Sequence, residues 1–87
     1  MTARIRLRAA VGEPLTDDGV RNIVASTARA IGERTGVRVE VAETDPDSIE
    51  LEVEASNLEA TALAAELRRI TDQWHDRRYG RPLWSEA

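Results

Sequence analysis

Three short stretches of this 87-residue chain alternate apolar with charged or small side chains, and this alternation limits its possible folds more than any other feature. In residues 4–11, the apolar residues Ile5, Leu7, Ala9 and Val11 alternate with Arg4, Arg6, Arg8 and Ala10. In residues 37–42, valines alternate with Arg38, Glu40 and Ala42, and in residues 49–54 glutamates follow Ile49, Leu51 and Val53. Successive side chains of a strand point to opposite faces, so the pattern predicts three half-buried β-strands.

Two amphipathic helices are predicted, one after the first strand and one after the third. The first begins at residues 16–18, where Thr16, Asp17 and Asp18 offer capping oxygens, and ends at Gly36. Its expected buried stripe is Val20, Ile23, Val24, Thr27 and Ile31. The second begins at Ser56, which can form a capping box with Glu59, and ends at Gly80. Its expected buried stripe is Ala60, Leu63, Leu67, Ile70 and Trp74.

Opposite charges on the outward faces predict how the strands pair. If the first strand lies antiparallel to the third, Arg4, Arg6 and Arg8 face Glu54, Glu52 and Glu50 in that order. The polar turn at residues 44–48 places the second strand on the other side of the third. The expected spatial order is therefore 2-3-1.

The predicted fold class is α+β: a βαββα two-layer sandwich with both helices on one face of an antiparallel sheet. This arrangement resembles the core of ferredoxin-like folds, a likeness of architecture that implies no function. The full arrangement has a fourth strand beside the first, and only residues 81–85, with Pro82 among them, remain to supply it. We expect a single domain over residues 1–80, followed by a C-terminal tail at residues 81–87.

Composition excludes several kinds of chemistry. The chain has no cysteine, which rules out disulfides, thiolate catalysis and cysteine-ligated metals. Its net charge of −4 argues against a nucleic-acid partner, and no apolar run is long enough to span a membrane. We expect a cytoplasmic protein with no cofactor and with neither nucleic acid nor membrane as a partner.

Candidate catalytic and metal-binding residues have simpler structural explanations. His75 is the only histidine and could act as a general base beside Asp72 or Asp76, but we expect a partly exposed structural residue. The acidic turn of Glu43, Asp45, Asp47 and Glu50 lacks the spacing of an EF-hand loop, so a solvated turn is expected. Residues 11–22 also lack the glycine-rich phosphate cradle of acylphosphatases, which share this element order. The sequence therefore assigns no catalytic, cofactor-binding or metal residue and favours a non-enzymatic protein.

The C-terminal segment at residues 74–84 contains the whole aromatic complement of the chain. Its aromatic residues alternate with arginines, and both types are enriched at binding hot spots. The predicted partner-binding residues are Trp74, Arg77, Arg78, Tyr79, Arg81 and Trp84. As an alternative, Trp74 continues the buried stripe of the second helix while Leu83 and Trp84 cap an open end of the sandwich.

The leading functional hypothesis is an interaction or accessory protein that binds a protein partner or forms a homodimer. Besides the aromatic segment, the open edge of the first strand offers unpaired backbone groups to another chain. The alternative hypothesis is a small-molecule-binding regulatory domain with its ligand at a dimer interface. A third, an enzyme whose site is shared between subunits, would require His75 or an acidic residue in a concave pocket.

Overall fold

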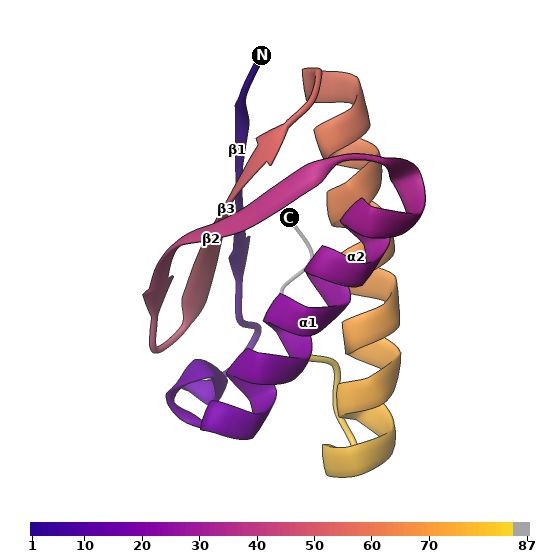
Figure 1. Cartoon of the computed structure of the whole chain (residues 1–87). Helices are drawn as coiled ribbons and strands as arrows, with labels where there is room; N and C mark the ends of the chain where they lie inside the picture. The colour runs from indigo at the N-terminus through magenta and orange to yellow at the C-terminus, as the bar shows by residue number, and fades with distance from the viewer. Residues whose placement is uncertain (85–87) are drawn as a thin grey trace.

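The computed structural model describes residues 1–84 (Figure 1). Its elements are the strand β1 (Ala3–Arg8), a short 3₁₀ helix η1 (Pro14–Thr16), the helix α1 (Asp18–Thr35), the strands β2 (Arg38–Asp45) and β3 (Ser48–Glu54), and the helix α2 (Asn57–Tyr79). The three strands form one antiparallel sheet in the order β1-β3-β2. The predicted βαββα order and the 2-3-1 arrangement are confirmed.

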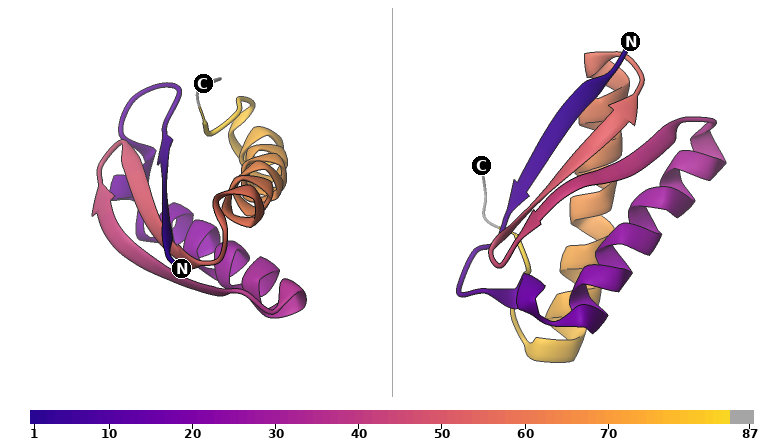
Figure 2. Two further views of the ribbon diagram at one scale, coloured as in Figure 1. Left: turned by 90° about the horizontal axis from the view of Figure 1, so that it is seen from above. Right: turned by 60° about the vertical axis from the view of Figure 1, so that its left-hand side comes forward.

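Both helices lie on the same side of the sheet, with α1 packed against β2 and α2 against β1 (Figures 1 and 2). The core between the layers is aliphatic, and its fully buried members include Ile31, Ile49, Leu51 and Leu67. The other face of the sheet carries the charged residues of the strands. The chain is therefore a two-layer α+β sandwich, as the sequence predicted.

The predicted register between β1 and β3 is wrong by two residues. Arg4 lies opposite Glu52 and Arg6 opposite Glu50, while Arg8 faces Ser48. A shift of two residues keeps every side chain on its own face, so the charges alone could not exclude it. On the apolar side, the observed register places Leu7 beside Ile49 and Ile5 beside Leu51.

Arginines of β1 neutralise much of the acidic turn. The Arg6 guanidinium lies 3.6–3.7 Å from carboxylate oxygens of Glu43, Asp45 and Glu50, and Arg4 donates a 3.0 Å hydrogen bond to Glu50. Within residues 1–84, no group of three or more histidine, aspartate or glutamate residues is arranged to hold a metal ion. The turn is therefore part of a charge ladder across the outer face.

The helix ends follow the predicted capping chemistry. The carboxylate of Asp17 accepts hydrogen bonds from the backbone N–H groups of Gly19 and Val20, and the capping box of Ser56 and Glu59 is present. Both helices end at a glycine with positive φ, Gly36 and Gly80. These ends fix the lengths of the helices. They therefore also fix how far α2 extends beyond the sheet.

The buried stripes of both helices differ from the predicted ones. In α1 the buried residues are Val20, Val24, Ala28, Ile31 and Gly32. Ile23 is 37% exposed instead of buried, and Thr27 is only partly buried. In α2 the buried residues are Ala60, Leu63, Ala64, Leu67, Thr71 and His75, whereas Ile70 and Trp74 are partly buried. The expectation of a partly exposed His75 is wrong, because only 5% of the residue is accessible.

The shift in the α2 stripe has its cause in the chain that follows the helix. After Gly80 the backbone turns back, so that Leu83 and Trp84 enter the core with 1% and 3% exposure. Trp84 donates its indole N–H to the hydroxyl of Thr71 at 2.8 Å, and Nδ1 of His75 lies 2.8 Å from the carbonyl oxygen of Arg81. The returning chain thus covers the side of α2 that the periodicity had placed nearer to water.

Asp72 holds this returning chain to α2. One oxygen of its carboxylate accepts the backbone N–H groups of both Leu83 and Trp84, each at 2.9 Å. On the other side, the Leu83 carbonyl accepts the N–H of Ala10 at 2.9 Å, and Trp84 forms an isolated antiparallel bridge with Ala9. Within residues 1–84 this bridge stands where a fourth strand would begin, and residues 85–87 of the predicted tail lie outside the described residues.

Gly32 is predicted to tolerate no side chain. A Cβ added there would lie 2.5 Å from the Val37 carbonyl oxygen and 2.9 Å from the side chain of Val39. In an exposed helix, glycine to alanine stabilises by about 1 kcal/mol. Here we expect Gly32→Ala to lower the free energy of unfolding by roughly 1–3 kcal/mol through overpacking, as measured by urea denaturation. A higher denaturation midpoint would contradict the close packing of α1 on β2.

Loss of the Asp72 carboxylate is predicted to destabilise the domain. Asp72→Ala leaves two backbone N–H groups beside the core without their charged acceptor, so we expect a loss of about 2 kcal/mol or more in urea denaturation. Asp76→Ala, on the same helix but at an exposed position, is the matched control and should change stability by less than about 0.5 kcal/mol. Equal effects of the two substitutions would contradict the anchoring role of Asp72.

Candidate partner-binding groove

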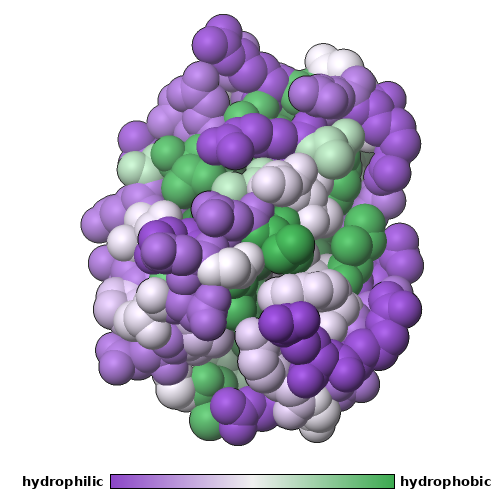
Figure 3. All heavy atoms as spheres, turned by 60° about the horizontal axis from the view of Figure 1, so that its bottom comes forward, coloured by the Kyte–Doolittle hydropathy of each residue, from purple (hydrophilic) through white to green (hydrophobic). Residues whose placement is uncertain are grey.

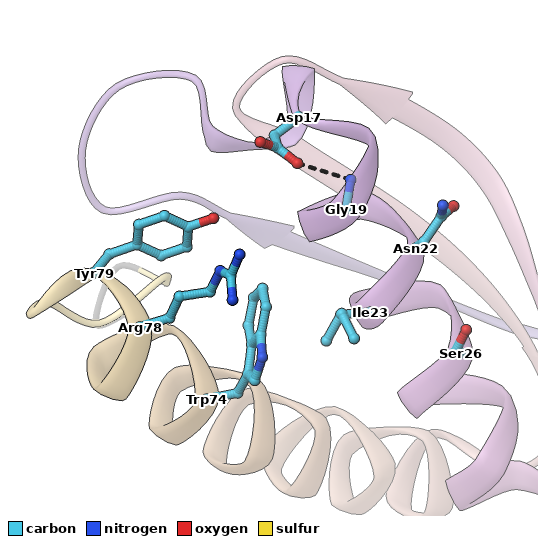
Figure 4. Close-up of a pocket in the computed structure, with 8 residues that line it drawn as sticks. All are labelled: Asp17, Gly19, Asn22, Ile23, Ser26, Trp74, Arg78 and Tyr79. Atoms are coloured by element: carbon cyan, nitrogen blue, oxygen red, sulfur yellow. Dashed lines mark hydrogen bonds between the residues drawn. The ribbon is translucent and has the colours of Figure 1, made fainter.

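A groove of about 470 Å³ separates the first half of α1 from the last turns of α2. Trp74, Arg78 and Tyr79 line it from α2, and their side chains project toward α1 (Figure 4). The opposite wall consists of Asp17, Gly19, Asn22, Ile23 and Ser26. We call this feature the α1/α2 groove.

The α1 wall is one helical face made of small and polar residues. Gly19, Asn22, Ile23 and Ser26 follow the spacing i, i+3, i+4, i+7, which places them along one side of the helix. Gly19 and Ser26 are too small to reach α2, so the space between the helices stays open. Ile23 supplies the one aliphatic side chain on this wall and points toward Trp74 in Figure 4.

The α2 wall is an aromatic cluster with a cation beside it. The rings of Trp74 and Tyr79 meet edge to face with centroids 6.2 Å apart, and the Tyr79 ring lies 4.5 Å from that of the buried His75. The guanidinium of Arg78 sits 5.8 Å from the centre of the Tyr79 ring, within range of a cation–π contact. The mutual contacts of these rings restrict their rotamers, so the wall is largely fixed before anything binds.

Apolar surface is exposed here in small amounts. Tyr79 is 46% exposed and Ile23 37% exposed, and Trp74 is partly buried. The face of the molecule in Figure 3 shows hydrophobic atoms in separate patches among hydrophilic ones. A groove of this kind offers a few apolar anchors and not a broad hydrophobic interface.

The basic residues at this end of the molecule lack carboxylate partners. Within residues 1–84, no salt bridge involves Arg77, Arg78 or Arg81. The carboxylate that lines the groove, Asp17, already accepts two backbone N–H groups as the cap of α1. Within the described residues, these three arginines thus have no ion pair that a carboxylate of another molecule would have to displace.

The structure separates the six residues that the sequence grouped as partner-binding. Trp74, Arg78 and Tyr79 lie together in the α1/α2 groove. Arg81 lines a smaller adjoining pocket of about 180 Å³ that also includes His75 and Tyr79. Arg77 is exposed and directs its Nε to the Gln73 carbonyl at 3.4 Å, outside the groove. Trp84 is buried in the core, so in this conformation its ring presents almost no surface to another molecule.

Sequence reasoning missed the α1 wall. The sequence pattern predicts a buried Ile23 and an exposed Asn22, and it indicates no binding role for Asn22 or Ser26. The signal was present as a run of small and polar residues at helical spacing directly beside the apolar stripe. Such a face is equally typical of ordinary solvated helices, and only the position of α2 makes it part of a groove.

The arrangement supports binding more than reaction. The groove provides aromatic faces, one aliphatic side chain, a guanidinium, an amide, a hydroxyl and the carboxylate of Asp17, which serves as the cap of α1, whereas the ring of His75 is buried with its Nδ1 against a backbone carbonyl. In the described part of the chain, no helix is long and apolar enough to cross a bilayer.

Comparisons with known proteins add no family to this picture, because no protein-family model and no curated protein matches the chain.

Proposed function

We propose that this protein is a small interaction domain that captures a segment of another protein in the α1/α2 groove. The segment presents a large apolar side chain to Trp74, Ile23 and Tyr79, with an aspartate or glutamate beside it for Arg78. The single observation that carries this proposal is the groove itself, where an aromatic pair and an unpaired arginine face a helix wall of small residues.

Composition and rigidity both support a protein segment as the occupant. Tryptophan, tyrosine and arginine dominate the energetics of protein interfaces, and the two aromatic types bury much area at a low cost in side-chain entropy. The ring contacts among Trp74, His75 and Tyr79 fix this wall in advance, which reduces the ordering cost of binding.

Charge selects the partner. Within residues 1–84, Arg77, Arg78 and Arg81 form no ion pair, whereas Arg4 and Arg6 of β1 are paired with glutamates across the sheet. A partner with carboxylates beside its apolar anchor would gain favourable contacts with these arginines. An arginine-rich or lysine-rich segment would meet like charge there.

A small-molecule ligand is the second candidate occupant. The groove volume of about 470 Å³ lies within the range typical of ligand sites, roughly 300–1,000 Å³. Unlike the sequence-based alternative, this site lies within a single chain and needs no dimer. A thermal-shift screen with small carboxylic acids that carry aromatic rings would reveal such a ligand.

Selection from a random peptide library is the direct test. The library is first depleted on an Ile23→Asp/Arg78→Glu double variant and then selected on the unaltered protein. We expect the enriched peptides to pair an aromatic or large aliphatic residue with aspartate or glutamate. Each single substitution should weaken their binding by about tenfold or more, as measured by isothermal titration calorimetry.

Two matched substitutions control for general effects of charge. Leu58→Asp changes another exposed aliphatic residue, at the far end of α2, and Arg29→Glu changes an exposed arginine of α1 outside the groove. Both should leave affinity within about twofold, since surface substitutions away from a contact have small effects. Peptides that bind all variants equally would count against the groove, as would peptides that change the NMR signals of residues distant from Ile23 and Tyr79.

A shorter chain is a poor test. Ending it after Arg78 would also remove Leu83 and Trp84, which belong to the core. Loss of binding would then report unfolding, so point substitutions in the groove are the better choice.

A further inference from the structure

The backbone of β1 has one side paired with β3 and the other side directed away from the sheet. The N–H of Ala9 donates to the Asp47 carbonyl at 2.7 Å on the β3 side, and the N–H of Ala10 donates to the Leu83 carbonyl at 2.9 Å on the opposite side. Successive N–H groups of a strand alternate between its two sides. The N–H and C=O groups of Arg4 and Arg6 therefore point toward the outer edge.

This outer edge is only partly covered. The returning chain bridges β1 at Ala9 through Trp84, past the end of the strand. Within residues 1–84, the outward backbone groups of Arg4 and Arg6 have no hydrogen-bond partner. Ile5 lies between them on the helix side of the sheet and is only partly buried. In the part of the chain that the structure describes, an open position for a short strand remains along the first half of β1.

On the outer face of the sheet around Arg4 and Arg6, the charged side chains change from acidic on β2 and β3 to basic on β1. The rows across the three strands are Arg4, Glu52 and Glu40, followed by Arg6, Glu50 and Glu43. The β1 edge is therefore basic and the β2 edge acidic. An added strand beside β1 extends these rows on the basic side, so acidic side chains on its outward face would be favoured.

A second copy of this chain fits the open position poorly. Two β1 strands side by side would place arginines against arginines, which is destabilising for directly opposed residues. The β2 edge has acidic side chains but contains a bulge between Val41 and Glu43, which interrupts regular pairing. Both features favour a different protein as the source of the added strand.

We propose that the β1 edge at Arg4 and Arg6 accepts an extended segment of a partner protein whose alternate residues are aspartate or glutamate. The backbone of the segment pairs with the free groups of β1, its carboxylates face the two arginines, and its intervening apolar residues lie beside Ile5. This surface lies on the sheet, whereas the α1/α2 groove lies between the helices, and the two sites are independent.

A nine-residue peptide with the sequence of residues 47–55 is a suitable probe, because it carries three glutamates on one face and three aliphatic residues on the other. Titration into the ¹⁵N-labelled protein should shift the Arg4 and Arg6 amides and slow their hydrogen exchange. The Ile5 and Leu7 amides, directed toward β3, should show little change. Affinity should fall by about tenfold when the three glutamates are replaced with lysine.

A second control separates strand addition from simple charge attraction. The same peptide, N-methylated at consecutive residues so that neither backbone edge can donate hydrogen bonds, keeps its charges and should bind about tenfold more weakly. The Ile23→Asp/Arg78→Glu variant should bind the unmodified peptide as the unaltered protein does, so a failed groove and a failed edge are distinguishable.

Three outcomes would overturn the proposal. Slow exchange of the Arg4 and Arg6 amides in the free protein would show that the edge is already covered. Equal binding of the unmodified and methylated peptides would reduce the interaction to charge attraction. A dimer by light scattering, with Arg4 and Arg6 protected at its interface, would make a second copy the occupant.

Discussion

The two hydrogen bonds that Asp72 accepts from Leu83 and Trp84 determine how the C-terminal part of this protein is used. They turn the chain back after Gly80 and hold it between α2 and the end of β1. Hydrogen bonds to a charged acceptor contribute about 1.5–3 kcal/mol each, a large part of the stability of a domain this small. Without them, Leu83 and Trp84 would lack a fixed position over the open end of the sandwich.

The anchoring by Asp72 divides residues 74–84 into residues that are buried in the core and residues that line the groove. Trp84 is drawn inward and its indole N–H reaches the buried hydroxyl of Thr71, which in turn donates to the Leu67 carbonyl. The covered side of α2 then runs through Thr71 and His75. Trp74, Arg78 and Tyr79 are left on the side that faces α1, where they form the wall of the groove. The same interaction also brings Trp84 to the outer edge of β1 and leaves the first half of that edge open.

The sequence predicted the elements, the strand order and the capping residues. Each of these depends on local chemistry or on the short repeat of apolar residues along a strand or a helix. It did not predict the register of β1 on β3, since a shift of two residues keeps Arg4 and Arg6 opposite glutamates and loses only the pairing of Arg8, which faces Ser48. It also misplaced His75 and Ile23, because their burial depends on where a distant segment packs. Asp72 illustrates the limit most clearly: it is a partly buried helix residue whose role depends on backbone groups eleven and twelve residues further along the chain.

Fluorescence of two single-tryptophan variants tests most directly whether the C-terminal segment is divided in this way. Trp74→Phe retains the buried Trp84, which should emit at short wavelength and resist quenching by acrylamide. Trp84→Phe retains the partly buried Trp74 beside the groove, and its emission should lie at longer wavelength with several-fold stronger quenching, provided that circular dichroism shows the variant to be folded. Equal quenching of the two variants, or stronger quenching of Trp84, would show that the segment does not return to the core and would remove the basis of the groove.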